Sequence, residues 1–322
     1  MNHAVRIHET GGPEVLRFEE SPVGEPATGE ALVRHTAVGL NFIDTYHRTG
    51  LYPLPLPAVL GSEAAGVVEA IGPGVTEVAV GDRVAYCGGP GAYAERRLIP
   101  SSRLVRLPDA ISDDQGAALM LKGLTAWYLL FRTRPVQSGE SIVVHSAAGG
   151  VGLLLCQWAS ALGARVIGVV SSDDKADMAR ANGAAEVLIY GRDPLADRVR
   201  ALSGGGVPVV YDAVGKDTFD ASLDCLRPLG LMVSYGNASG PVGPVNLLEL
   251  SRRGSLFLTR PSLVHYIAAR ADLVAGADAL FGAVAAGALR VVIGQRYPLA
   301  EVAQAHRDLE ARKTVGSTVL VP

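Results

Sequence analysis

The stretch Ser141-Ile142-Val143-Val144-His145-Ser146-Ala147-Ala148-Gly149-Gly150-Val151-Gly152 decides the fold of this chain. Its first half is an apolar run typical of a buried strand, and the residues from Leu153 onward continue as a helix. Gly149 and Gly152 occupy the second and third glycine positions of the G-x-G-x-x-G pattern, and Ala147 takes the first. The second glycine lets the backbone approach a pyrophosphate, and the third lets the helix pack closely on the strand. The stretch therefore predicts a turn that binds a dinucleotide at a helix N-terminus.

The residues after the turn complete the unit in which such a site occurs. A helix over 153–162 ends at Gly163, and Arg165–Val170 predicts the next buried strand. The resulting βαβ unit of about 30 residues has the length that the fingerprint requires. We therefore interpret the turn as a dinucleotide site and not as an ordinary tight bend.

The end of the second strand indicates which dinucleotide binds. NAD sites usually place an acidic residue there to bind the ribose hydroxyls, whereas this chain has Ser171 and Ser172, followed by Lys175. Hydroxyl groups and a cation suit a 2′-phosphate. Asp173 and Asp174 either serve as that acidic residue or are first-turn acids of the next helix that face solvent, and we favour the second alternative. The sequence thus predicts NADPH.

Composition is that of an α/β enzyme. The 322 residues allow about two domains, and the 48% of hydrophobic residues can fill a sizeable core. The net charge of −3 and the absence of long Lys/Arg runs argue against a nucleic-acid surface. No apolar run is long enough for a membrane helix, and residues 1–10 lack the apolar segment of a signal peptide, so we expect a cytoplasmic protein. The three distant cysteines, Cys87, Cys156 and Cys225, are predicted to be reduced and structural.

Two patterns of apolar residues divide the chain. Up to about residue 105, short apolar runs broken by Gly and Pro favour a mostly antiparallel β domain. Between 122 and 259, six strands alternate with helices, which predicts a doubly wound parallel sheet. The remainder predicts an Ala-rich helix over 263–289, a strand near Tyr297, a helix over 300–312 and a last strand, Ser317–Val321. We expect domains at 1–121 and 122–259, with 260–322 returning to the first.

Nine segments, spread over essentially the whole chain, resemble one family. They are Gly11–Leu16, Asn41–Tyr46, Gly61–Gly66, Gly81–Val84, Leu121–Thr125, Ala147–Gly152, Tyr211–Gly215, Tyr235–Gly240 and Thr259–Ser262. The chain resembles the medium-chain dehydrogenase/reductase superfamily and, within it, the zinc-independent NADPH quinone oxidoreductases, the ζ-crystallin-like group. The resemblance implies an α/β fold in which a Rossmann doubly wound parallel sheet joins a GroES-like β-rich catalytic domain. It also implies a homodimer.

A departure from the zinc alcohol dehydrogenases of that superfamily predicts the chemistry. Those relatives hold zinc with a Cys and a Gly-His-Glu segment, whereas the matching segment here is Gly61-Ser62-Glu63. Because a hydroxyl is a poor zinc ligand beside imidazole or thiolate, we expect a metal-free site with Glu63 in a structural role. Without a Lewis acid, an acceptor that spreads incoming charge by conjugation is favoured, such as a quinone or an enone.

The resemblance also implies the site residues. Asn41 and Tyr46 would position the nicotinamide and the acceptor oxygen, and Tyr52 would line the substrate pocket. Tyr46 either donates a hydrogen bond to the developing oxyanion or only shapes the pocket, with water as the proton source. Lys122 is either part of the contact made by Thr125 or a solvated helix residue. The cofactor-binding set that the resemblance implies is Asn41, Tyr46, Thr125, Ala148, Gly149, Gly150, Val151, Ser171, Lys175, Tyr190, Tyr235, Gly236, Asn237 and Ser239.

Three functions remain open at this point. The first is an NADPH-dependent quinone oxidoreductase, and the second is an NADPH-dependent double-bond reductase that acts on alkenals or enones. The third is a non-catalytic NADPH- or RNA-binding protein, and the acidic balance of the chain argues against the RNA-binding form of it.

Overall fold

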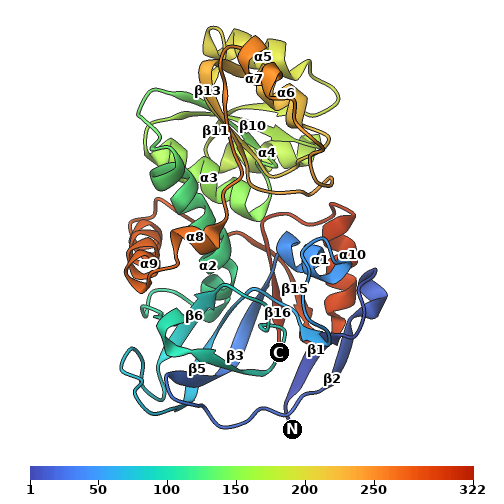
Figure 1. The fold of residues 1–322 in the computed structure, drawn as a ribbon. Coiled ribbons are helices and arrows are strands. Elements are labelled where there is room, and N and C mark those ends of the chain that lie inside the picture. Colours follow the sequence, from blue (N-terminus) through green and yellow to red (C-terminus); the bar gives the residue numbers. More distant parts are fainter. The chain divides into compact units, whose positions relative to one another are not determined.

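The computed structural model describes residues 1–322, which form two compact units. Unit 1 comprises residues 1–124, 267–285 and 291–322, and unit 2 comprises residues 125–266 and 286–290 (Figure 1). The chain passes from unit 1 to unit 2 inside a single helix, α2 (Asp113–Trp127). The sequence suggested boundaries at 121 and 259, whereas the units divide after residues 124 and 266, and residues 286–290 also belong to unit 2. The first of these points lies within a continuous helix, which leaves no linker in the sequence.

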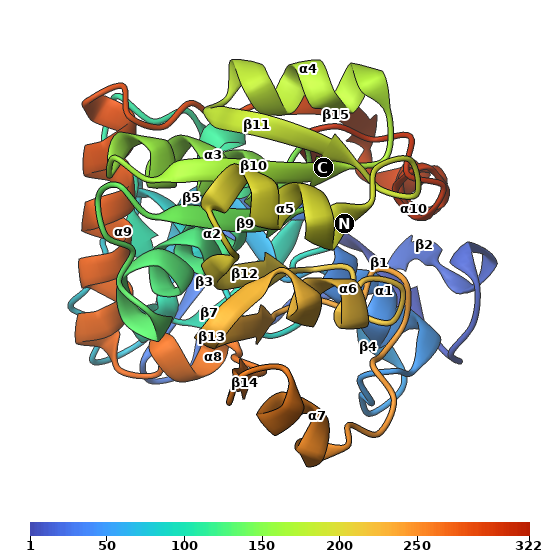
Figure 2. The same ribbon diagram turned by 90° about the horizontal axis from the view of Figure 1, so that it is seen from above.

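Unit 2 contains a parallel sheet of six strands in the order β11-β10-β9-β12-β13-β14 (Figure 2). The strands are β9 (Ser141–His145), β10 (Arg165–Val170), β11 (Ala184–Ile189), β12 (Val207–Asp212), β13 (Leu226–Ser234) and β14 (Phe257–Thr259). The chain builds the sheet outward from β9 in one direction and then outward from β12 in the other. This order confirms the predicted doubly wound sheet, and it places the topological switch point between β9 and β12.

Helices precede, connect and follow these parallel strands. They are η3, a π-helical segment (Tyr128–Thr133), α3 (Gly150–Ala161), α4 (Asp173–Ala181), α5 (Leu195–Ser203), α6 (Phe219–Asp224), α7 (Leu247–Arg252) and α8 (Leu263–Tyr266). Helices α3 and α4 pack against β9, β10 and β11, whereas α5 packs against β12 and α6 packs against β12 and β13. Apolar side chains of the strands and of α5 and α6 form one buried cluster around Val143 and Val210.

Unit 1 is built from two sheets. The larger has seven strands in the order β15-β16-β3-β5-β6-β8, with β7 also paired to β3, and the smaller has the order β2-β1-β4. The strands are β1 (His3–Ile7), β2 (Arg17–Glu20), β3 (Glu30–Leu40), β4 (Ala58–Val59), β5 (Glu63–Ile71), β6 (Arg83–Cys87), β7 (Arg96–Pro100), β8 (Val105–Arg106), β15 (Ile293–Pro298) and β16 (Ser317–Val321). The helices wholly within unit 1 are η1 (Pro13–Val15), α1 (Phe42–Thr49), η2 (Ser101–Arg103), α9 (Arg270–Ala285), η4 (Leu299–Glu301) and α10 (Val302–Glu310).

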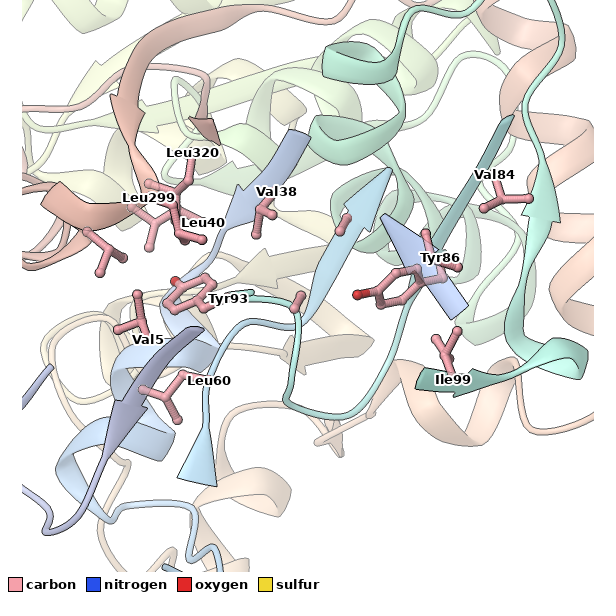
Figure 3. Close-up of a cluster of buried hydrophobic side chains, with 14 of the residues drawn as sticks. Val5, Val38, Leu40, Leu60, Val84, Tyr86, Tyr93, Ile99, Leu299 and Leu320 are labelled. Carbon is pink, nitrogen blue, oxygen red and sulfur yellow. The ribbon is translucent and has the colours of Figure 1, made fainter. Parts of the chain in front are cut away.

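One apolar core joins the beginning and the end of the chain in unit 1. The last strand, β16, pairs antiparallel with β3, and Leu299 and Leu320 pack in the same buried cluster as Val5 and Leu40 (Figure 3). Tyr93 places its ring in this cluster, while its hydroxyl takes part in a polar network described below. The β-rich unit predicted from the first 105 residues is therefore completed by the C-terminal segment.

The Ala-rich segment is broken into two helices. The sequence predicted one helix over 263–289, but the structure has α8 over Leu263–Tyr266 and α9 over Arg270–Ala285. Between them, the carbonyl of Ile267 accepts a hydrogen bond from Arg103 at 3.1 Å, and Ile267 itself is buried. A tertiary contact thus overrides local helix propensity where the chain leaves unit 2.

Candidate active site

The glycine turn of unit 2 has the geometry of a phosphate cradle. Strand β9 ends at His145, Ser146 adopts a left-handed conformation (φ 52°), and α3 begins at Gly150 with Gly149 as its N-cap. A Cβ atom on Gly152 would overlap the carbonyl oxygen of Ser146, so only glycine lets α3 pack this closely on the turn. The first turn of α3 carries no acidic residue, and its free N–H groups favour an anion. A dinucleotide pyrophosphate fits this site.

A buried carboxylate organises the neighbouring loop. Asp212, at the end of β12, accepts hydrogen bonds from the main-chain N–H of Val214 (2.6 Å) and from the hydroxyls of Thr218 and Ser222 (2.7 and 2.8 Å). After β13, the N–H of Tyr235 donates to the carbonyl of Asp212 at 2.8 Å. These bonds fix the loops after β12 and β13 at the carboxyl edge of the sheet, beside the switch point.

The predicted loop 235–239 packs closely on the residues after β12. A Cβ on Gly236 would overlap the carbonyl oxygen of Ala213. The hydroxyl of Ser239 donates to the carbonyl of Val214 at 2.9 Å and accepts from the N–H of Asp217 at 3.0 Å. Ser239 therefore has a clear structural role in this loop.

The strand ends beyond the glycine turn carry the polar groups predicted for a 2′-phosphate. Ser171 follows β10 and is exposed, and Lys175 lies in the first two turns of α4. Asp173 is exposed and forms a two-bond ion pair with Arg192, both bonds at 2.9 Å. This hydrogen-bonded partner lowers the pKa of Asp173. Tyr190 follows β11, and its hydroxyl donates to the carbonyl of Asp217 at 2.7 Å.

Arg192 was not found from the sequence. It is separated from Asp173 by 19 positions, and no motif joins the two. The ion pair shows that Asp173 is a surface acid in the first turn of α4, as favoured above. It also adds a second cation to the region of Lys175.

In unit 1, Asn41 lies between β3 and α1, beside a buried ion pair. Its side-chain amide nitrogen donates to Oε1 of Glu63 at 2.9 Å. The same carboxylate accepts from Nζ of Lys122 at 2.5 Å and from the N–H of Leu121 at 2.7 Å. Glu63 is fully buried and Lys122 is 5% exposed. Lys122 is therefore no solvated helix residue, because it neutralises a carboxylate in the interior.

Gly39 makes this arrangement possible. It pairs with Glu63 across strands β3 and β5. A Cβ on Gly39 would overlap both the Glu63 side chain and the carbonyl oxygen of Ala117 in α2. A glycine at this point of β3 thus lets Glu63 cross the strand to reach Asn41, and it lets α2 approach.

A second buried carboxylate, Asp44, begins a chain of hydrogen bonds that leads to the C-terminal helix. Asn41 and Asp44 form a capping box at the start of α1, in which Asp44 accepts from the N–H of Asn41 at 2.9 Å. Asp44 also accepts from the hydroxyls of Ser62 (2.6 Å) and Tyr93 (2.9 Å). Burial raises the pKa of Asp44 to about 6, although these donors act in the opposite direction.

The far end of this chain fixes its direction. Arg48 carries only donors, so Nδ1 of His306, 2.9 Å from it, must accept. Nε2 of His306 then bears the proton and donates to the hydroxyl of Tyr93 at 3.1 Å. Burial and the Arg48 charge lower the pKa of His306 to about 3, and Arg48 is neutralised by Glu310. In this series of hydrogen bonds, Arg48 donates to His306, His306 donates to Tyr93, and Tyr93 donates to the Asp44 carboxylate.

Two of the predicted catalytic residues, Tyr46 and Tyr52, pack against each other. The ring centroids of Tyr46 in α1 and Tyr52 after it are 5.3 Å apart in an edge-to-face arrangement, and the N–H of Tyr52 donates to the carbonyl of Tyr46 at 3.0 Å. The structure thus brings Tyr46 and Tyr52 together, and both follow Asn41 in the sequence. Of the predicted cofactor set, Asn41 and Tyr46 belong to unit 1, whereas Thr125 and the remaining residues belong to unit 2.

The residues that replace a zinc-binding segment are engaged elsewhere. The Ser62 hydroxyl donates a hydrogen bond to Asp44, and both carboxylate oxygens of Glu63 accept hydrogen bonds. No group of three or more His, Cys, Asp or Glu side chains is arranged to hold a metal ion. None of the helices combines the length and hydropathy needed to cross a membrane.

Two family models match this chain. Residues 150–280 match the model described as zinc-binding dehydrogenase. Residues 27–109 match the model of the alcohol dehydrogenase GroES-like domain. The first match covers most of unit 2 and part of α9 in unit 1, and the second lies within unit 1.

Relatives that match over nearly the whole chain identify the family more closely. A quinone oxidoreductase of Pseudomonas aeruginosa is 56% identical over 100% of both chains, and a 2-haloacrylate reductase of Burkholderia is 47% identical over 99% of this chain and 98% of the relative. The structure of an Escherichia coli quinone oxidoreductase in complex with NADPH superimposes with a TM-score of 0.98 at 47% identity, over 99% of this chain and 100% of that one. The chain therefore belongs to the medium-chain dehydrogenase/reductase superfamily and, within it, to the ζ-crystallin-like family of quinone oxidoreductases.

Proposed function

We propose that this protein is an NADPH-dependent quinone oxidoreductase that transfers hydride from NADPH to a quinone without a metal ion. The observation that carries the proposal is the 56% identity over the full length to a quinone oxidoreductase, together with a glycine turn shaped for a dinucleotide. NADPH supplies the hydride when it is bound. The protein supplies binding groups, orientation and electrostatics.

The cofactor site is assigned to groups that fit it. The turn from Ala148 to Val151 and the N-terminus of α3 would hold the pyrophosphate. Ser171, Lys175 and Tyr190 would surround the 2′-phosphate. In an NAD site the strand end would present a free carboxylate, but Asp173 is paired with Arg192. Further contacts are assigned to Thr125, Tyr235, Gly236, Asn237 and Ser239.

Asn41, Tyr46 and Tyr52 are assigned to the nicotinamide and the acceptor. Asn41 is held by Glu63, so its amide has a fixed orientation for a ligand. The Tyr46 hydroxyl is assigned to donate a hydrogen bond to the oxygen that becomes negative as the quinone is reduced. Tyr52, which packs on Tyr46, lines the pocket.

A steady-state comparison of acceptors tests the assignment. NADPH oxidation is measured with a 1,4-quinone and with a 2-alkenal, and the proposal expects the higher kcat/KM for the quinone. The Burkholderia relative named 2-haloacrylate reductase supports the alternative, an enone reductase. A higher kcat/KM on the alkenal would establish that alternative. Salt-sensitive RNA retention on a filter, without NADPH oxidation, would instead favour a binding protein.

The edge of the unit 2 sheet supports a homodimer. Strand β14 pairs only with β13 and ends the sheet. Phe257 in β14 and Leu247 in the adjoining α7 are 59% and 74% exposed. We assign this edge to a second copy of the chain, because an open edge with exposed apolar side chains is a template for pairing. Sedimentation velocity of wild type and Phe257→Asp should show a dimer that the substitution weakens, and a monomeric wild type would contradict it.

The thiols support the proposed cytoplasmic location. All three cysteines are buried and free, and burial raises the pKa of each. Such unreactive, reduced thiols are typical of a reducing compartment. Fractionation of the source cells with an antibody to the protein would test this location, and recovery outside the cytoplasmic fraction would contradict it.

A further inference from the structure

The hydrogen bonds of Glu63 determine which way the Asn41 amide faces. The side-chain nitrogen of Asn41 donates hydrogen bonds to the Glu63 carboxylate at 2.9 Å and to the carbonyl of Gly39 at 3.5 Å. Both of these groups can only accept. An amide turned the other way would bring its oxygen against a carboxylate and a carbonyl. The nitrogen of Asn41 is therefore committed to the protein interior.

The other half of the amide is its oxygen. The capping box places the Asn41 side chain at the first turn of α1. A carbonyl oxygen has two lone pairs, so it can accept a hydrogen bond from a main-chain N–H in the first turn of α1 and another from one further donor. A ligand that meets Asn41 must then offer a hydrogen-bond donor.

The ion pair that enforces this orientation is built into the core. Glu63 receives Lys122 and the N–H of Leu121 in addition to Asn41, so three donors hold a carboxylate that is fully buried. Gly39 is the glycine that makes room for it. A carboxylate so fixed cannot follow a moving amide, and it sets the position of Asn41 rather than adapting to it.

We propose that Glu63, held by Lys122, is a positioning residue that fixes Asn41 as a hydrogen-bond acceptor for the carboxamide N–H of the nicotinamide. This inference rests on the proposed function, which assigns Asn41 to the nicotinamide. Neither Glu63 nor Lys122 touches the reacting atoms in this account. Both act through Asn41 alone.

The experiment combines three variants with two cofactors. Glu63→Gln/Lys122→Met removes both buried charges together, so neither is left unpaired. Asn41→Ala removes the acceptor, and the triple variant combines the changes. Affinity is measured by calorimetry for NADPH and for its reduced 3-acetylpyridine analogue, which carries a methyl ketone in place of the carboxamide and so lacks the N–H donor. Asp113→Asn, which breaks an ion pair with Arg83 on the same helix as Lys122, is the control for general loosening of unit 1.

The account expects non-additive losses. Asn41→Ala and the double variant should each weaken NADPH about fivefold to tenfold, the effect of one hydrogen bond, and should leave the analogue nearly unchanged. The triple variant should then bind NADPH no worse than Asn41→Ala, because Glu63 acts only through that residue. Asp113→Asn should retain the affinity of wild type for both cofactors.

Additive losses in the triple variant would overturn the positioning role and leave the proposed function intact. Unchanged NADPH affinity and unchanged quinone turnover in Asn41→Ala would remove Asn41 from the site, which is a failure of the assignment on which the inference rests. If the double variant does not fold, wild type and Asn41→Ala still decide the acceptor role. Equal losses of affinity for NADPH and for the analogue would contradict it.

Discussion

The residues assigned in unit 2 and those assigned in unit 1 are held by different kinds of interaction. In unit 2 the groups assigned to the cofactor are turns at the ends of parallel strands, and glycines such as Gly152 and Gly236 set their shape. In unit 1 the assigned residues depend on buried charges, with Glu63 holding Asn41 and Asp44 capping α1. Main-chain geometry suits an anionic ligand of constant shape, whereas buried charges can orient a single side chain. The contrast suggests that binding and positioning can be altered separately.

The largest expected effect comes from filling the turn in unit 2. Gly152→Ala places a Cβ against the carbonyl oxygen of Ser146 and should cost about 3 kcal/mol or more of stability, with loss of NADPH binding. Gly282→Ala in α9 is a matched control, because no atom lies within 4 Å of the position that its Cβ would take. That control should stabilise the protein by roughly 0.5–1 kcal/mol. Urea unfolding and NADPH titration measure both, and equal behaviour of the two variants would contradict the close packing at Gly152.

A pH-dependent loss of stability is expected from His306, in the buried series of hydrogen bonds that ends at Asp44. The folded protein keeps His306 neutral down to about pH 3, whereas the unfolded chain binds a proton below about pH 6.5. Stability should therefore fall as the pH falls through this window, and this group contributes about 2 kcal/mol of that loss between about pH 6.5 and pH 5.

His306→Gln tests this contribution. Asp44 acts in the opposite sense, because its raised pKa of about 6 favours the folded state as the pH falls, but it is present in both proteins. Urea unfolding at the two pH values should show a shallower pH dependence for the variant. The same dependence in both proteins would mean that His306 is protonated in the folded state.

Lys175→Ala tests the assigned 2′-phosphate site. Loss of a charge-assisted hydrogen bond should weaken NADPH by about 1–2 kcal/mol and leave NADH nearly unaffected. Fluorescence titration with the two cofactors measures the difference. Equal losses for NADPH and NADH would remove Lys175 from the phosphate site and would direct attention to Arg192.

The smallest effect is expected at Tyr46. If its hydroxyl donates to the developing oxyanion, Tyr46→Phe should lower kcat by a few-fold, the effect of one hydrogen bond of about 1 kcal/mol, and leave the affinity for NADPH nearly constant. The packing of the ring on Tyr52 is retained in this variant. An unchanged kcat would mean that water provides the proton and that Tyr46 only shapes the pocket.

The two units also differed in how well the sequence predicted their interactions. The turn and the six strands of unit 2 were predicted, because strand periodicity and glycine spacing are local signals. The pairing of Lys122 with Glu63 was not predicted, since it joins residues 59 positions apart, one in α2 and the other in β5. The contact of Arg48 with His306 spans 258 positions. No local pattern reports such pairs, and the same is true of the tertiary contact that ends α8 before α9.

Turnover of metal-free protein tests the central claim most directly. Purified protein is treated with a chelator, its zinc content is determined by elemental analysis, and NADPH oxidation is followed with a 1,4-quinone. The account predicts full activity with substoichiometric zinc, because Ser62 and Glu63 are engaged within the protein. Stoichiometric zinc in the active protein, with turnover abolished by its removal and restored by its return, would contradict it.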